Sequence, residues 1–455
     1  MQTKNMTTGR PLPLILKFAL PLMAGNLFQE FYTLADMVIV GQFLGVNALA
    51  AVGNTGWITW MLLAAVQGFS QGFSISAAQA FGAGDMPKLR RSMANSLLLS
   101  AIMSIVLGIL GQLILHPLLT LMKTPDEIFP TSLCYLRIYY AGCPILMAFN
   151  FAASHLRALG NSSAPLRAMI IASLTNIGLD LLFVGPFGWG VPGAVIATLI
   201  AQLVAAAYAL RCLFRIDCVR ISCKELRIDP LLAKHQLRLG TPMSLQNIII
   251  SIGGFIVQSI VNRYSIAYIA GFTATNRLYG LIETCGLSYG YAVTTYVGQN
   301  NGAGEHRRIR EGTRSANIIA VVTSLIIGLT AILFGEALVG LFISGTPQEI
   351  VEATYVAYRY LCVMAALLPI LYVLHILRSA IVGMGNSTIP MLSGFGELIM
   401  RVSASLLLAH FFNEMSLFYA EPIAWLGADL VLITGYYWCV RRYLPDTLRR
   451  KPSAA

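Results

Sequence analysis

The chain has 455 residues, of which 56% are hydrophobic and only 11% are charged. Soluble domains carry about 25% charged residues, so this composition excludes an ordinary soluble enzyme and is typical of a protein that crosses a membrane many times. The net charge of +11 does not indicate nucleic-acid binding, because the basic residues gather in short loops between apolar segments.

Twelve long apolar segments follow one another along the chain. A helix needs about 20 mostly apolar residues to cross a bilayer, and each segment is long enough. The predicted spans lie near residues 14–40, 48–78, 92–115, 131–156, 164–185, 191–213, 237–262, 266–297, 313–335, 352–382, 388–412 and 419–441. We therefore predict an all-α polytopic membrane protein with twelve transmembrane helices.

The orientation follows from lysine and arginine. Loops on one side hold most of these residues, whereas the loops on the other side hold only Lys123 and Arg263. Cytoplasmic loops carry the excess of basic residues in membrane proteins. We predict a multi-pass protein of the cytoplasmic (inner) membrane with both termini in the cytoplasm. The basic residues that support this orientation include Lys224, Arg449, Arg450 and Lys451.

The two halves of the chain repeat one pattern. CPILMAFNFAASHLRALGNSSAP at residues 143–165 aligns without gaps with LPILYVLHILRSAIVGMGNSTIP at residues 368–390. An even number of spans in each repeat predicts two six-helix bundles, related by pseudo-twofold symmetry about an axis along the membrane normal. A cavity is expected between the bundles. The predicted domains are an N-terminal lobe (1–213), a cytoplasmic linker (214–236) and a C-terminal lobe (237–455).

Asp36 and Asp180 interrupt the repeat, because they align with Val257 and Ser405. Neither carboxylate is therefore needed merely to build a six-span unit. An ionised carboxylate near a bilayer centre costs about 2.5–3.5 kcal/mol, and such residues are functional by default. Pro21, earlier in the first span, removes one helix hydrogen bond and predicts either a hinge or a static kink.

Polar residues precede each aspartate at helical spacing, so they share its helix face. These residues are Gln29, Thr33, Ser173 and Asn176. Two buried carboxylates cannot both ionise at low cost, so Asp36 and Asp180 are suited to binding and releasing a proton. The same oxygens, with Thr198 as a further ligand, would also suit sodium. The alternative is a structural hydrogen-bond network that ties these helices together.

Several other charges lie inside predicted spans. Glu397 and Arg401 are four residues apart, which predicts a local ion pair. Glu283 and Arg378 have no partner at such spacing, so we expect them to line the cavity. Glu30 points away from the face of Asp36 and would contact either the cavity or a neighbouring helix.

The first span, LPLMAGNLFQEFYTLADMVIVGQFLGVNALAAVG, and the paired GAG and GNS turns resemble the multidrug and toxic compound extrusion (MATE) family. The resemblance covers essentially the whole chain and is closest to the prokaryotic DinF-like branch. It implies a bend at Pro21 and substrate contacts at Gln29 and Asn150. The ion-coupling residues that it implies are Asp36, Asn176, Asp180, Thr198 and Ala194, the last through its backbone oxygen if sodium binds.

The implied function is secondary active export of drug-like organic compounds, often cationic, in exchange for H⁺ or Na⁺. We expect a monomer in the lipid bilayer with no enzyme activity, no cofactor apart from the coupling ion, and no nucleic-acid partner. The expected substrate-binding residues are Gln29, Asn150, Glu30, Glu283 and Arg378. One alternative is a flippase for a lipid-linked saccharide or another amphiphile, and another is a membrane scaffold or receptor without transport activity.

Overall fold

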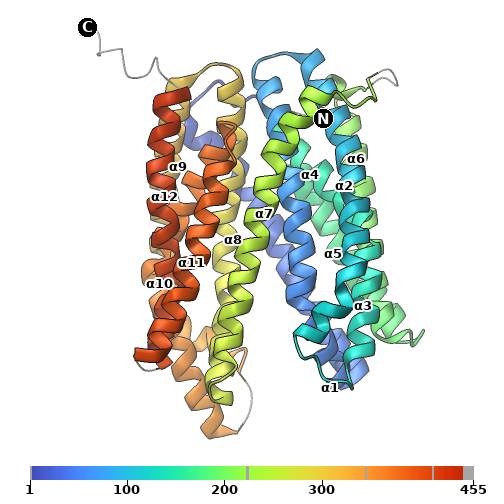
Figure 1. The fold of residues 1–455 in the computed structure, drawn as a ribbon, viewed down its shortest axis with the longest axis vertical. Helices are drawn as coiled ribbons and strands as arrows, with labels where there is room; N and C mark the ends of the chain where they lie inside the picture. Colours follow the sequence, from blue (N-terminus) through green and yellow to red (C-terminus); the bar gives the residue numbers. More distant parts are fainter. Residues whose placement is uncertain (1–2, 222–224, 344–345, 412–413, 444–455) are drawn as a thin grey trace. The chain divides into compact units, whose positions relative to one another are not determined.

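The computed structural model describes residues 3–221, 225–343, 346–411 and 414–443 (Figure 1). Four basic residues that contributed to the predicted orientation lie outside these ranges: Lys224, Arg449, Arg450 and Lys451. Parts of the predicted linker and of the C-terminal lobe lie outside them too. The orientation of the termini therefore stays a prediction.

Helices make up nearly all of the described chain. The first half contains α1 (Pro11–Gly82), α2 (Met86–Leu121), α3 (Phe129–Ala141), α4 (Cys143–Ala158), α5 (Ser163–Val184), α6 (Gly190–Phe214) and the short 3₁₀ helix η1 (Asp217–Val219). The second half contains α7 (Pro230–Val261), α8 (Ile266–Gly302), α9 (His306–Gly340), α10 (Pro347–Gly383), α11 (Thr388–Phe411), the 3₁₀ helix η2 (Glu414–Tyr419) and α12 (Ala420–Tyr443).

These helices supply the twelve predicted spans. In the described ranges, nine helices are long and apolar enough to cross a membrane, or ten if α3 and α4, which bend by 48°, form one span. The remaining two are α8 and the second part of α1, residues 46–82, which carry more polar side chains. Gly45 separates the two parts of α1, because its φ of 81° is not helical. Glycine adopts this backbone conformation without strain.

The chain forms two compact units. Unit 1 contains Leu20–Asn247 together with the first residues of the chain, and unit 2 contains Met6–Ala19 and the described residues from Ile248 onward. The first helix of each half therefore begins within the unit formed mainly by the other half. The lobe bounds predicted from the repeat stay a prediction.

The N-terminal segment is held in unit 2 through its backbone. The Met6 amide donates to Gln299 Oε1 at 2.8 Å, and Asn300 Nδ2 donates to the Met6 carbonyl at 3.1 Å. Arg308 Nη2 donates to the Gly9 carbonyl at 2.9 Å. Because Met6 is fully buried, these bonds satisfy backbone groups that water cannot reach.

The start of α7 belongs to unit 1 because it approaches the second part of α1 very closely. A Cβ atom on Gly68 would overlap the backbone of Ser244, and one on Gly72 would overlap the backbone of Gly240. Small residues four positions apart on both helices allow such an approach in membrane proteins. Gln236 adds a second contact of the start of α7 with unit 1, since it is buried and forms hydrogen bonds with Asn95 and Ser96 of α2.

We expect Gly68→Val to lower the melting temperature of the purified protein by roughly 5 °C, because the two backbones must separate to admit the side chain. Gly56→Val is the matched control, since a Cβ atom on Gly56 meets no other heavy atom within 4 Å. The same helix receives the same residue in both variants. Equal melting temperatures would contradict the proposed helix contact.

A buried carboxylate pair as the candidate functional site

The candidate ion site lies in unit 1 and draws on three helices. Asp36 lies in the first part of α1 and Asp180 lies in α5. The two carboxyl groups are close enough to interact electrostatically. Asp180 is fully buried and Asp36 is half-buried. The structure thus brings together the two acids that interrupt the sequence repeat.

Several oxygens of this site have no hydrogen-bond donor in the described part of the chain. They are Asp36 Oδ1, Asp180 Oδ1 and Oδ2, Asn176 Oδ1 and Gln202 Oε1. None of the ion pairs found among the described residues includes either aspartate. Burying a charge without a partner is costly, so this group of acceptors is suited to receiving a proton or a cation.

The α5 and α6 side chains are oriented by two hydrogen bonds. Asn176 Nδ2 donates to Thr198 Oγ1 at 3.3 Å, and the Thr198 hydroxyl donates to the Ala194 carbonyl at 3.1 Å. The Thr198 hydroxyl has one hydrogen, which its bond to Ala194 uses, whereas Nδ2 of Asn176 has a second N–H. The amide oxygen of Asn176 has no donor among the described residues, and Asn176 lies one helical turn before Asp180.

Tyr32 and Gln202 also belong to this cluster, and the sequence analysis missed both. Gln202 Nε2 donates to the Tyr32 hydroxyl at 3.4 Å, and Tyr32 is close enough to Asp36 to interact electrostatically. A signal was present in the sequence. Tyr32 lies four residues before Asp36 and Gln202 lies four residues after Thr198, so each shares a helix face with a predicted residue.

The residues expected to bind substrate are divided between the units. Gln29 and Glu30 are half-buried in α1, and Asn150 is buried in α4, where its Nδ2 donates to a backbone carbonyl one turn earlier. Glu283 and Arg378 lie in unit 2, on α8 and α10. Their contribution to a common substrate chamber stays a prediction.

Pro21 lies inside α1, which remains helical on both sides of it. The proline is the second residue of α1 that belongs to unit 1, after Leu20. The predicted hinge at Pro21 stays a prediction.

Unit 2 contains a second group of buried charges. The predicted pair of Glu397 with Arg401 is confirmed, with 2.8 Å between Oε1 and Nη2. Arg378 Nη2 lies 2.9 Å from Glu397 Oε2, and Arg401 Nη2 lies 2.8 Å from Glu421 Oε2. Spacing along a single helix showed no partner for Arg378, because its partner comes from α11.

Two further contacts extend this group. His375 Nε2 lies 3.5 Å from Glu283 Oε1 across α10 and α8. Asp429 of α12 is buried near Arg378 and Glu397, and its Oδ1 has no donor among the described residues. The sequence analysis named neither Glu421 nor Asp429, since both were counted only as parts of the last span.

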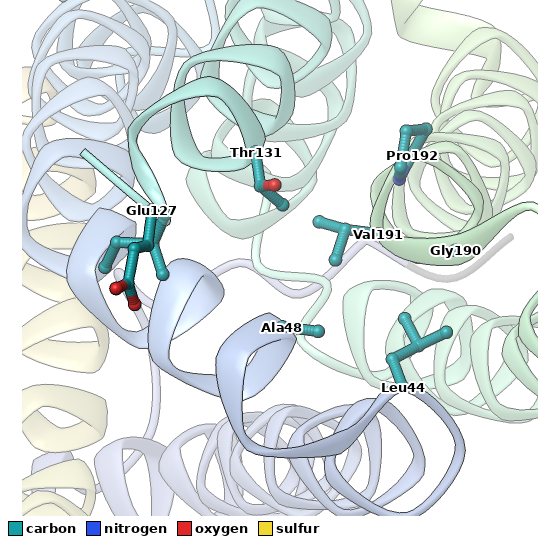
Figure 2. Close-up of a pocket in the computed structure, with 8 residues that line it drawn as sticks. Leu44, Ala48, Glu127, Thr131, Gly190, Val191 and Pro192 are labelled. Carbon is teal, nitrogen blue, oxygen red and sulfur yellow. The ribbon is translucent and has the colours of Figure 1, made fainter. Parts of the chain in front are cut away.

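A pocket of about 320 Å³ lies in unit 1, near the break in α1 at Gly45. Figure 2 shows apolar side chains from α1 and the start of α6 on its walls, including Leu44 and Val191, with the Glu127 carboxylate at one side. None of the predicted site residues lines it. The pocket and the candidate ion site are therefore separate features of unit 1.

Comparison with known proteins identifies the family. The family model described as MatE matches residues 21–182 and, a second time, residues 242–407. The chain belongs to the MATE family. The two matches cover the two halves of the internal repeat, so the family resemblance stated from the sequence is confirmed.

Individual relatives agree with this assignment to the MATE family. The chain is 30% identical to the Probable multidrug resistance protein YpnP of Bacillus subtilis over 349 residues, which cover 76% of this chain and 77% of that protein. It is 27% identical to the Probable multidrug resistance protein YoeA of the same organism, over 92% of each chain. A solved outward-facing structure of a multidrug resistance MATE family transporter superposes with a TM-score of 0.89 at 25% identity, covering 99% of this chain and 100% of that chain.

MATE transporters have twelve helices in two bundles, so the predicted fold class is confirmed. Members of the family are multidrug efflux transporters and multi-pass membrane proteins. They are not enzymes, they need no cofactor, and their transport is coupled to an ion. These comparisons do not favour the flippase alternative.

Proposed function

We propose that this MATE protein is a secondary active antiporter that exports drug-like organic compounds in exchange for protons or sodium ions. The observation that supports this proposal is the Asp36–Asp180 pair, in which Asp36 Oδ1 and both Asp180 oxygens have no donor among the described residues. Both residues lie in helices that are apolar and long enough to cross a membrane. Binding an ion from outside compensates the charge of an intramembrane carboxylate pair that has no internal counter-ion, and such an ion can later leave.

The pair can couple ion binding to a change in shape. With no ion bound, two neighbouring carboxylates repel each other, and ion uptake removes that repulsion between α1 and α5. The ion therefore favours one arrangement of these helices over another, which is the requirement for shifting a conformational equilibrium. In the proposed cycle, the outward-facing protein takes up the ion, releases the drug outside and returns to face the cytoplasm.

The remaining steps of the proposed cycle take place on the cytoplasmic side. There the ion leaves Asp36 and Asp180, and the next substrate binds. We assign substrate contacts to Gln29, Glu30 and Asn150 in unit 1. In unit 2, we separately assign substrate contacts to Glu283 and Arg378. We further propose that the protein acts as a monomer in the cytoplasmic membrane with both termini inside.

Purified protein in liposomes tests this function directly. A fluorescent organic cation is followed while either a proton gradient or a sodium gradient is imposed alone. We expect one of the two gradients to drive movement of the cation against its own gradient, and the same experiment identifies the coupling ion. If neither gradient drives movement, the antiporter proposal fails and a scaffold or receptor without transport activity is favoured.

Thr198→Val distinguishes the two ions by a second route. Sodium would use the Thr198 oxygen as a ligand, so its loss should raise the half-saturating sodium concentration about tenfold. Proton coupling needs no such ligand, so the pH of half-maximal transport should stay unchanged. Thr198→Ser keeps the hydroxyl and is the matched control. A change of equal size in both variants would exclude a direct role for the hydroxyl.

A further inference from the structure

The three helices that form the candidate ion site have counterparts in unit 2. Through the internal repeat, α5 aligns with α11, so that Ser163 at the start of one helix matches Thr388 at the start of the other. Likewise the first part of α1 corresponds to α7, and α6 corresponds to α12. The helix α5 packs against α6 in unit 1, and α11 packs against α12 in unit 2.

Arg401 occupies the position that matches Asn176, one turn before the match of Asp180. Its guanidinium group contacts all three helices of the unit 2 site. Nη2 lies 2.8 Å from Glu397 of α11 and 2.8 Å from Glu421 of α12. Nη1 donates to the Ile250 carbonyl of α7 at 3.3 Å. One buried positive charge thus connects α7, α11 and α12.

Helix α7 leaves room for this guanidinium group. A Cβ atom on Gly253 would lie 3.0 Å from Arg401 Nη1. At this distance a side chain at position 253 would push the guanidinium group aside. The repeat aligns Gly253 with Tyr32 and Val257 with Asp36. Where α1 presents a hydroxyl and a carboxylate, α7 therefore presents a space and an apolar side chain.

The direct ion pairs in this part of unit 2 join two guanidinium groups to two carboxylates, with Asp429 and Glu283 as further acids nearby. Arg378 Nη2 lies 2.9 Å from Glu397 Oε2, so two guanidinium groups face the carboxylates of Glu397 and Glu421. In unit 1 the two aspartates have no such internal cation among the described residues. Among the described residues, the group of buried charges in unit 2 thus contains its own cation, whereas the two aspartates of unit 1 have none in an ion pair.

We infer that Arg401 is a built-in cation that permanently fills, in unit 2, a monovalent-cation site equivalent to the exchangeable ion site of unit 1. This inference rests on the ion site proposed at Asp36 and Asp180. A tethered guanidinium group cannot leave, so α7, α11 and α12 stay connected at every step of transport. Only α1, α5 and α6 then respond to the ion, which explains why two similar halves contain a single coupling site.

Removing the Arg401 side chain should open this site to an external cation. In Arg401→Ala, Glu397 keeps Arg378 as its partner, whereas Glu421 loses its only ion pair among the described residues. We expect the melting temperature of the purified variant to fall by several degrees. Guanidinium chloride at low millimolar concentration should recover at least half of that loss, while the same concentration leaves the wild-type protein unchanged.

The double variant Arg401→Ala with Glu421→Gln is the matched control, because it removes the positive and the negative charge together. It should melt close to the wild-type temperature and should not respond to guanidinium. If the single variant cannot be purified, the stability of the double variant tests the inference. Recovery of a stable protein supports the inference, and failure of both variants overturns it, since Arg401 would then be needed for its shape.

Two further results would overturn the inference. One is an Arg401→Ala protein as stable as wild type, and the other is an equal guanidinium response in the single and double variants. The melting assay uses no gradient and leaves Asp36 intact. Absence of ion-driven transport would therefore count against the proposed function, whereas absence of a guanidinium response counts against the built-in cation.

Discussion

Replacing Asp36 with asparagine should abolish ion-driven export and leave the protein folded. Asparagine matches the shape of aspartate but can neither take up a proton nor contribute a negative charge to a sodium site. Asp180 would then have no charged partner, so ion binding would no longer relieve a repulsion between α1 and α5. We expect gradient-driven movement of a fluorescent cation to fall to the level of protein-free liposomes.

The melting temperature provides the second measurement for Asp36→Asn. A ligand that binds only the folded protein stabilises it, so the wild-type protein should melt at a higher temperature when its coupling ion is added. The variant should lose that response without melting at a lower temperature in the absence of the ion, because the substitution removes a poorly compensated buried charge.

Asp429→Asn is the matched control, since Asp429 is also a buried acid with an unpartnered oxygen but lies on α12 in unit 2. This control should keep ion-driven export. Wild-type export rates from Asp36→Asn would show that the carboxylate pair does not couple transport. Equal loss of export in both variants would show that any buried acid is needed, rather than this pair.

Replacing Glu397 with glutamine should cause the largest loss of stability. This carboxylate pairs with Arg378 through one oxygen and with Arg401 through the other, at 2.9 and 2.8 Å. Removing its charge leaves Arg401 paired with Glu421 and leaves Arg378 without an ion pair among the described residues. Breaking a buried pair in this way costs about 3–5 kcal/mol, so we expect the melting temperature to fall by roughly 10 °C.

Glu349→Gln provides the control for the same chemical change at the protein surface. Glu349 belongs to the capping box at the start of α10, where its Oε2 accepts a hydrogen bond from the Thr346 amide at 2.9 Å. Glu349 is exposed, so losing its hydrogen bond to the cap should lower the stability far less than breaking the buried pairs of Glu397. If Glu397→Gln loses no more stability than Glu349→Gln, the buried charge network does not stabilise unit 2.

Helix content and family were readable from the sequence because their signals are local or repeated. The apolar runs predict spans directly, and the two matching segments of the repeat predict two similar bundles. The same comparison selected Asp36 and Asp180, since Val257 and Ser405 show that the repeat can be built without them. The structure brings these two carboxyl groups together, while their coupling role stays a proposal.

Contacts between different helices were harder to predict from the sequence. The periodicity of one helix shows which residues share a face, but not which helix that face meets. For this reason Glu421 was missed as a partner of Arg401, and Glu397 was missed as a partner of Arg378. Gln202 and Tyr32 were missed at the ion site for the same reason.

The sequence by itself therefore determined the membrane-spanning fold, the repeat, the family and the two acids that depart from the repeat. Only the tertiary structure decided that the start of α7 joins unit 1 and that Arg401 connects α7, α11 and α12. The physical reason is that such contacts depend on how closely helices approach and how they are rotated. Small residues such as Gly68 and Gly253 set those distances, and their effect becomes visible only when the opposite helix is in place.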